Sequence, residues 1–373
     1  MGSAKDHLDA KGQVKIECLI CNLFYHRIDL HVEKKHGMTA AQYSERFPKA
    51  KLMSESAAAV GVDLGTSSSA SIQFGVATLD IRTDLHAYCK GFVPEHDSNY
   101  QIGDHERANL EYLAMAMQDD ENVLIVGPPG VGKTLMAREL ASLANQPLRR
   151  LPFNGEMRVS DLVGSKEITV DEKTGQAITS WRDGPLVDSI QRGHWVLFDE
   201  FDSAPSTVTF LLHSLLENPR QLTLMGKDGG SEIVFDDKFR VIATSNTLGY
   251  GDESGLYAGT APMNEALLDR FGIVIRMDYP TRDAEIKILC DRTGVKRDWA
   301  AMMVDLAKEV REAQAKQTTL VSMSTRRLVA WASKAYRLNS VLRAARVTLL
   351  NKLTREDSAF IGGLVQRHFG SAA

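Results

Sequence analysis

The chain has 373 residues, of which 43% are hydrophobic and 25% are charged, and its formal net charge at pH 7 is −4. These values allow two or three domains with a sizeable core, and the small negative charge excludes a protein that coats nucleic acid by bulk charge. No apolar run approaches the roughly 18 residues that a membrane helix needs, and the N-terminus has no signal-peptide pattern, so the sequence predicts a cytoplasmic protein.

Within residues 1–53, two cysteines and two of the histidines stand at separations that suit a metal site. Cys18 and Cys21 are followed by His31 and His36. Thiolate and imidazole ligands can close a tetrahedral Zn²⁺ site, and two histidines five positions apart on a helix can reach one ion. The sequence therefore predicts a small zinc-binding module, with surface residues that bind no metal as the alternative.

The stretch from Cys18 to Phe47 resembles the prokaryotic zinc fingers of the Ros/MucR type, in which the residues after the second histidine form a further helix. Residues 1–53 hold nine Lys/Arg and six Asp/Glu, so positive charge collects there. The basic side chains could contact the phosphates of DNA or RNA, or they could be the solvated face of a module that docks a protein. They are Lys34, Lys35, Arg46, Lys49 and Lys51.

A linker is expected after this module. Residues 54–76 are rich in Ser, Ala and Gly, and such a composition buries too little apolar area to fold, which predicts a flexible tether. Residues 77–100 read as an irregular lead-in. The stretch Glu106–Gln118 has the pattern of an amphipathic helix just ahead of the first core strand.

The most specific signal is a glycine-rich loop between the apolar run Val123–Val126 and the helical pattern Leu135–Leu143. In that context the pattern G-x-x-x-x-G-K-[ST] predicts a phosphate site, because glycines let backbone N–H groups point at phosphate oxygens beside a helix N-terminus. We expect Lys133 to reach the β- and γ-phosphates of ATP and the Thr134 hydroxyl to ligate Mg²⁺. The loop comprises Gly127, Pro128, Pro129, Gly130, Val131, Gly132, Lys133 and Thr134.

Two later strands end in polar residues that suit the same site. The buried run Trp195–Phe198 leads to Asp199 and Glu200. Asp199 would hold Mg²⁺ through its water shell, and Glu200 would polarise the attacking water. The strand over residues 239–244 leads to Asn246, whose side-chain amide can orient that water.

These residues together resemble the AAA+ ATPases of the MoxR branch over residues 95–340, and within that branch the ATPase subunits of aerobic cobaltochelatases. The resemblance implies that Asn246 is the sensor 1 residue, that Arg270 is the arginine finger of the neighbouring subunit's site, and that Arg326 is the sensor 2 residue. The family usually has Pro before that last arginine, where this chain has Thr325, and Arg327 beside it leaves the register open. The shared sequences are Asp199-Glu-Phe-Asp202, Leu215-Leu-Glu217, Ala243-Thr-Ser-Asn246, Gly255-Leu-Tyr-Ala-Gly-Thr260 and Leu268-Asp-Arg270.

The resemblance implies an α/β fold: residues 77–280 form an AAA+ P-loop NTPase domain with a parallel sheet between helices, and residues 281–373 form an all-helical lid. Helical patterns at residues 284–290, 299–315, 325–337 and from about 341 agree with a lid. Alternation and turn residues predict hairpins at 166–179 and 221–235. They lie where the family carries its helix-2 insert and its pre-sensor-1 hairpin, with two plain surface hairpins as the alternative.

Two functions remain open. The first is an ATP-hydrolysing ring, expected to be hexameric, that remodels a partner protein, as the cobaltochelatase subunits do together with a von Willebrand A-type partner. The second is an ATPase that its zinc finger tethers to nucleic acid. The fused finger is a departure from the chelatase subunits.

Overall fold

The computed structural model describes residues 16–20, 24–25, 32, 39–47, 71–97, 100, 104–170, 176–227, 230–247 and 264–370. The chain divides into two compact units. One comprises Met1–Ser69 and Thr83–Tyr88, and the other comprises Ala70–Arg82 and Cys89–Ala373.

The first unit contains a short hairpin and a helix. Strand β1 (Ile16–Glu17) pairs with β2 (Phe24–Tyr25) in antiparallel fashion, and helix α2 spans Ala40–Arg46. Thr39 caps the helix in a capping box with Gln42. Tyr43 is fully buried, and the Leu19 amide donates to its hydroxyl at 2.8 Å. This bond holds the helix against the turn that follows β1.

The expected zinc site lies largely outside the described residues. Cys18 is buried, whereas Cys21, His31 and His36 are not among the described positions. The same is true of the basic residues Lys34, Lys35, Lys49 and Lys51. Zinc binding and nucleic-acid contact by this module therefore stay predictions.

The expected linker ends earlier than residue 76. Strand β3 (Ser71–Phe74) pairs with β4 (Ala77–Asp80) in an antiparallel hairpin, and a short helix α4 (Ala87–Lys90) follows. The hairpin forms because its apolar side chains pack in the core beside helix α5 (Asp104–Gln118), whose Gln118 side chain accepts from the Thr78 amide at 2.7 Å. Sequence patterning missed it because the strands are only four residues long.

Five parallel strands form the central sheet of the second unit, in the order β13-β5-β12-β9-β6. Counted along the chain, the order is 5-1-4-3-2, so the fourth strand lies between the first and the third. The carboxyl ends that carry the glycine-rich loop, the acidic pair and Asn246 therefore meet at one edge. The strands are β5 (Val123–Val126), β6 (Leu148–Pro152), β9 (Trp195–Asp199), β12 (Arg240–Ser245) and β13 (Ile273–Arg276).

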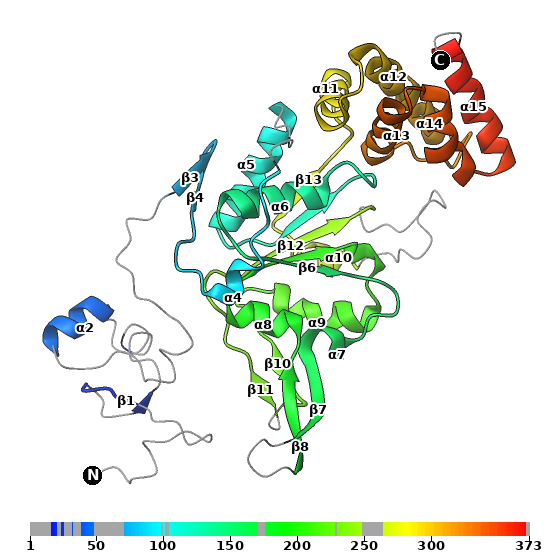
Figure 1. The fold of residues 1–373 in the computed structure, drawn as a ribbon. Helices are drawn as coiled ribbons and strands as arrows, with labels where there is room; N and C mark the ends of the chain where they lie inside the picture. The colour runs from blue at the N-terminus through cyan, green and yellow to red at the C-terminus, as the bar shows by residue number, and fades with distance from the viewer. Residues whose placement is uncertain are drawn as a thin grey trace. The chain divides into compact units, whose positions relative to one another are not determined.

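Helices cover both faces of this sheet (Figure 1). Val123 and Ile125 point to one face, where α5 and α6 (Lys133–Leu143) pack, and Leu124 and Val126 point to the other. Fully buried strands of this kind read as continuous apolar runs. On the second face and around the sheet edge lie α7 (Val159–Val163), α8 (Pro185–Gln191), the 3₁₀ turn η1 (Phe201–Ser203), α9 (Ser206–Leu216) and α10 (Glu265–Leu268).

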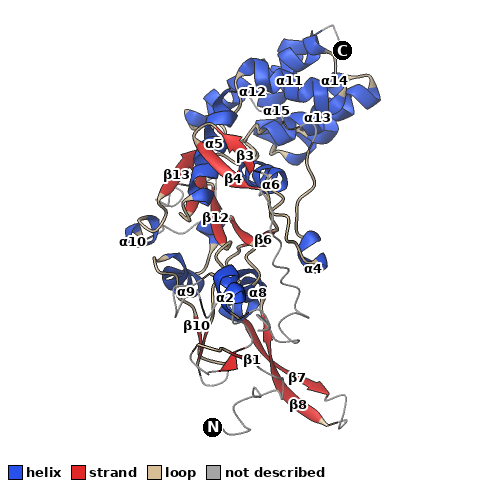
Figure 2. Ribbon diagram, turned by 90° about the vertical axis from the view of Figure 1, so that its left-hand side faces the viewer, coloured by secondary structure: helices blue, strands red, loops and turns tan. Residues whose placement is uncertain are grey.

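The two predicted hairpins are confirmed (Figure 2), and an ion pair between Lys227 and Asp183 joins them. Strand β7 (Gly164–Val170) pairs with β8 (Ala177–Asp183), and β10 (Thr223–Leu224) pairs with β11 (Ser231–Glu232), the second hairpin being shorter than expected. Lys227 donates to both Asp183 oxygens at 2.7 and 2.9 Å. A Cβ on Gly226 would lie 2.8 Å from the Trp181 ring. A salt bridge and a ring packed on a glycine thus join the hairpins.

The C-terminal part is a helical bundle with its own core. Inside it, the buried Glu285 accepts two hydrogen bonds from Arg311, at 2.7 and 2.9 Å, and one from the Thr325 hydroxyl at 2.6 Å. The single last helix expected from about residue 341 is two helices, because Thr354 caps a new one. The elements are α11 (Arg282–Thr293), α12 (Arg297–Ala315), α13 (Thr325–Leu338), α14 (Val341–Thr348), η2 (Leu350–Lys352) and α15 (Arg355–Phe369).

Among the described helices, none is both long enough and apolar enough to cross a membrane.

Candidate active site

The glycine-rich loop has the backbone that its composition predicts. Gly130 and Gly132 have φ angles of +76° and +107°, in the left-handed region that favours glycine. A Cβ on Gly127 would lie only 2.1 Å from the Met277 carbonyl oxygen. Helix α6 begins at Lys133, so the last two residues of the loop form the start of the helix, where the first amides have no partner within the helix.

Lys133 is buried within this loop. Its ammonium donates to the carbonyl oxygens of Gly127 at 2.6 Å and Pro128 at 3.0 Å, and to the Asn246 side-chain oxygen at 2.9 Å. Burial lowers the pKa of Lys133 to about 8, against the opposing influence of Asp202 and other carboxylates. The structure thus brings Lys133 and Asn246 together, as expected for one site.

Asp199 is the meeting point of three side chains. Its Oδ1 accepts from the Thr134 hydroxyl at 3.0 Å and also from the Thr244 hydroxyl, and its Oδ2 accepts from Arg150 Nε at 2.6 Å. Burial alone would raise the pKa of Asp199, but the hydrogen bonds from Thr244, Arg150 and Thr134 and the Arg150 charge lower it overall. The carboxylate is therefore held ionised.

The Thr134 hydroxyl and the Asp199 carboxylate fit a magnesium ion. They are oxygen ligands of the kind that Mg²⁺ prefers, they lie 3.0 Å apart, and both line the same cavity. These two residues would hold the ion, which when bound offsets phosphate charge.

Glu200 stands at the mouth of the site. Its side chain is exposed and lines the cavity, and its backbone has a φ of +58°, a left-handed conformation that is uncommon outside glycine. The Glu200 amide donates to the Thr244 hydroxyl at 3.2 Å. Strained backbone of this kind is concentrated at functional sites.

Asn246 is held by a carboxylate that the sequence did not single out. The Asp202 Oδ2 atom accepts from the backbone amide of Asn246 at 2.9 Å, from the backbone amide of Thr247 at 3.1 Å and from the Thr247 hydroxyl at 3.2 Å. Asp202 is 2% exposed. It fixes the backbone of the loop that presents the Asn246 side chain.

Lys133, Thr134, Asp199, Glu200 and Asn246 line one cavity of about 470 Å³, a size typical of small-molecule sites. Apolar side chains line it together with the polar groups: Val131, Leu135, Met277, Pro280, Ile288 and Val329. Arg326 lines the cavity too, whereas Arg327 donates to the Ser322 carbonyl at 2.7 Å. The structure thus places Arg326 at the cavity, and Arg327 is not among its lining residues.

Arg270 does not line this cavity. Its guanidinium donates to the Ala266 carbonyl and to a carboxylate oxygen of Glu217, at the end of α9. The shared sequence 255–260 lies outside the described residues. Of the expected site residues in the second unit, those from Pro129 to Thr134 together with Asp199, Glu200, Asn246 and Arg326 line this cavity, and Gly127, Pro128 and Arg270 do not.

Three contributors were missed by sequence reasoning: Arg150, Asp202 and Thr244. Thr244 and Asp202 stand beside recognised residues in their motifs, and that proximity was the available signal. Arg150 lies on β6, and only the placement of β6 beside β9 brings it to Asp199.

The sequence is similar to those of known protein families. Residues 122–271 match the family described as AAA domain (dynein-related subfamily), and residues 285–366 match the family described as CbbQ/NirQ/NorQ C-terminal. The aerobic cobaltochelatase subunit CobS of Sinorhizobium sp. is 33% identical over 302 residues, which cover 80% of this chain and 89% of that protein. An uncharacterised protein of Staphylococcus saprophyticus is 29% identical over 66% of this chain and 91% of its own length.

Among solved structures, the RuvB Holliday junction branch migration motor of Thermotoga maritima is 18% identical, with a TM-score of 0.44 over 76% of this chain and 82% of that one.

Proposed function

Because this chain belongs to the MoxR-type AAA+ ATPases that include CobS, we propose that it works as a ring whose ATP hydrolysis remodels a partner protein. The observation that carries the proposal is the cluster of Lys133, Thr134, Asp199, Glu200 and Asn246 around one cavity at the carboxyl edge of a parallel sheet.

Each residue of the cluster has a distinct part in hydrolysis. The loop amides and Lys133 bind the β- and γ-phosphates, and Thr134 with Asp199 holds Mg²⁺. Glu200 accepts the proton of the attacking water, which Asn246 orients. Arg326 contacts the phosphates from the helical bundle, so that bundle responds to the state of the nucleotide.

Arg270 completes the active site of the neighbouring subunit. Its absence from the lining of its own cavity supports a role in trans. A guanidinium supplied to the γ-phosphate by a neighbour is worth roughly 10³-fold or more in rate in other phosphoryl-transfer enzymes. Assembly and hydrolysis are then coupled, with a hexamer as the expected ring.

The partner is a protein, and the CobS relative suggests its type. That relative is a subunit of an aerobic cobaltochelatase, and we extend to this chain a chelatase-like arrangement with a von Willebrand A-type partner. Exposed apolar side chains on the two hairpins support contact with a protein: Ile168, Val170 and Ile178 on the first, and Met225 and Val234 on the second.

The test combines two inactive variants. Glu200→Gln should bind ATP–Mg²⁺ and hydrolyse it very slowly, because it lacks the group that accepts the proton of the attacking water. Arg270→Ala should behave in the same way, because each site lacks the guanidinium of its neighbour. In a mixed ring, some interfaces join the intact Glu200 of one subunit to the intact Arg270 of the next, so part of the activity should return. No recovery in demonstrated mixed rings would contradict the role of Arg270 in trans.

A further inference from the structure

Arg270 needs support from elsewhere in the fold, because its own segment is short. It follows the four-residue helix α10 and precedes β13 by only two residues. A group that acts across a subunit interface must be held in place before the partner arrives, since a shift of about 1 Å can cost on the order of 10²-fold in rate. The structure shows where that support comes from.

Asn122, just before β5, binds the backbone of Arg270. Its side-chain amide nitrogen donates to the Arg270 carbonyl at 2.9 Å and to the Leu216 carbonyl at 2.8 Å. Asn122 is 7% exposed, so these bonds are shielded from water. Each hydrogen of the NH₂ group thus goes to a different segment of the chain.

Those two segments are the ones that the Arg270 side chain also joins. Leu216 is followed directly by Glu217, whose carboxylate accepts from the Arg270 guanidinium. The same pair of segments is therefore bridged twice, once by the guanidinium and its carboxylate, and once by Asn122 beneath them. The inner bridge sets the distance at which the outer one forms.

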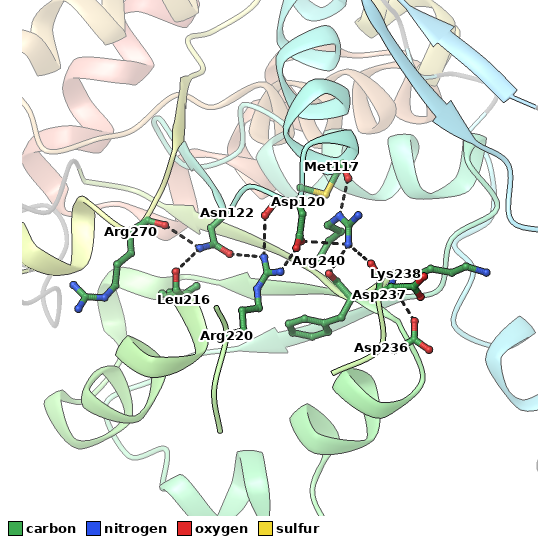
Figure 3. A network of polar contacts seen from close by, with 11 residues as sticks. Met117, Asp120, Asn122, Leu216, Arg220, Asp236, Asp237, Lys238, Arg240 and Arg270 are labelled. Atoms are coloured by element: carbon green, nitrogen blue, oxygen red, sulfur yellow. Dashed lines mark hydrogen bonds and ion pairs between the residues drawn. The ribbon is translucent and has the colours of Figure 1, made fainter. Parts of the chain in front are cut away.

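Asn122 is itself held in one orientation (Figure 3). Arg220 donates to its side-chain oxygen at 3.0 Å and to the Asp120 carboxylate at 2.5 Å. Arg240 approaches the same Asp120 carboxylate at 3.2 Å. With its oxygen fixed by Arg220, the amide of Asn122 can only present its NH₂ group to the two carbonyls. In Figure 3 the Arg270 side chain extends away from this network.

We propose that Asn122 is the positioning residue of the arginine finger: it fixes the Arg270 backbone relative to Glu217 and so presents the guanidinium to the neighbouring subunit. The proposal rests on the function in trans proposed above for Arg270. It differs from a purely structural role, because it places the effect of Asn122 in the neighbour's active site, although Asn122 directly precedes the strand that leads to its own phosphate loop.

The isosteric substitution Asn122→Asp removes both donors and keeps the acceptor for Arg220. We expect ATP affinity within about threefold of wild type and turnover at least about tenfold lower, since the chemistry loses an aligned group while the subunit's own pocket is kept. Asn145→Asp is the matched control. The Asn145 side chain also donates to a backbone carbonyl, that of Arg82 at 2.5 Å, and this variant should keep wild-type turnover.

Mixed rings assign the effect to one side of the interface. Asn122→Asp mixed with Glu200→Gln should regain activity, because the first variant offers an intact site and the second an intact finger. Asn122→Asp mixed with Arg270→Ala should regain none, because every finger is impaired. The opposite pattern, or wild-type turnover of Asn122→Asp, would overturn the proposal.

Two further measurements keep the outcome clear. Asn122→Ala, which removes both donors without adding a charge, takes the place of Asn122→Asp if thermal unfolding shows that the latter is not folded. The pair Arg270→Ala with Glu200→Gln runs in parallel. If that pair regains no activity, the role of Arg270 in trans is wrong. If it regains activity, and the Asn122 variants regain activity with Arg270→Ala but not with Glu200→Gln, only the role of Asn122 is wrong.

Discussion

ATP affinity should depend on pH through Lys133. Burial lowers the pKa of this lysine to about 8 in the nucleotide-free site, where the carboxylates of Asp202, Asp199 and Glu200 raise it and Arg326 lowers it further. Only the ammonium form attracts phosphates, and bound phosphates raise the pKa. Below pH 8 Lys133 is already protonated in the empty site, and above pH 8 it must take up a proton when ATP binds.

The size of the effect follows from that pKa. Between pH 7 and pH 9 the protonated fraction of a group with a pKa near 8 falls about tenfold, so the apparent Kd should rise by about tenfold, or about 1.4 kcal/mol. Titration calorimetry with a non-hydrolysable ATP analogue, in two buffers that differ in ionisation enthalpy, measures both the affinity and the proton uptake.

Lys133→Arg is the control, because a guanidinium keeps its proton throughout this range. Its affinity should be weaker at pH 7, since arginine does not fit the place of a lysine, but it should change little up to pH 9. The pH dependence would not come from Lys133 if the ATP affinity of the wild-type protein were constant from pH 7 to 9. The same conclusion would follow if the affinity of Lys133→Arg fell equally over that range.

Three other outcomes are expected. Asp202→Ala should lower the free energy of unfolding by about 3 kcal/mol, because three hydrogen bonds to a buried carboxylate are lost, and urea denaturation measures it; an unchanged midpoint would contradict the role given to Asp202. Gly127→Ala should impair ATP binding, because the new Cβ would meet the Met277 carbonyl at 2.1 Å and the loop would have to move; wild-type affinity in a filter-binding assay would count against the loop geometry. Purified protein should hold about one Zn²⁺ per chain by elemental analysis, lost in Cys18→Ser/Cys21→Ser while ATPase activity persists, and a folded but metal-free N-terminal module would end that prediction.

Sequence patterns predicted the features that depend on neighbouring residues. The glycine-rich loop could be predicted because a buried strand, the glycines and a helix start follow one another within a few positions. The two hairpins could be predicted because alternation and turn residues are also local features of the sequence. Helix α14 and helix α15 were merged, since the cap at Thr354 is one residue in a long periodic stretch.

Contacts that depend on strand order could not be predicted in this way. Arg150 reaches Asp199 only because β6 lies beside β9. Asn122 and Arg270 are 148 positions apart, and they meet because β5 and β13 are adjacent. Asp202 belonged to a recognised motif, but its acceptor role depends on the path that the chain takes after β12. Such residues become visible only after the topology is known.

The joined hairpins have a consequence for how this protein can diversify. Lys227 and Asp183 come from different hairpins, as do Gly226 and Trp181, so a change in one hairpin alters the fit of the other. Neither hairpin can be exchanged alone with that of a relative without leaving a charge without its counter-ion or a ring without its glycine. We therefore expect a chimera to keep these contacts only when residues 164–183 and 221–235 are transplanted together.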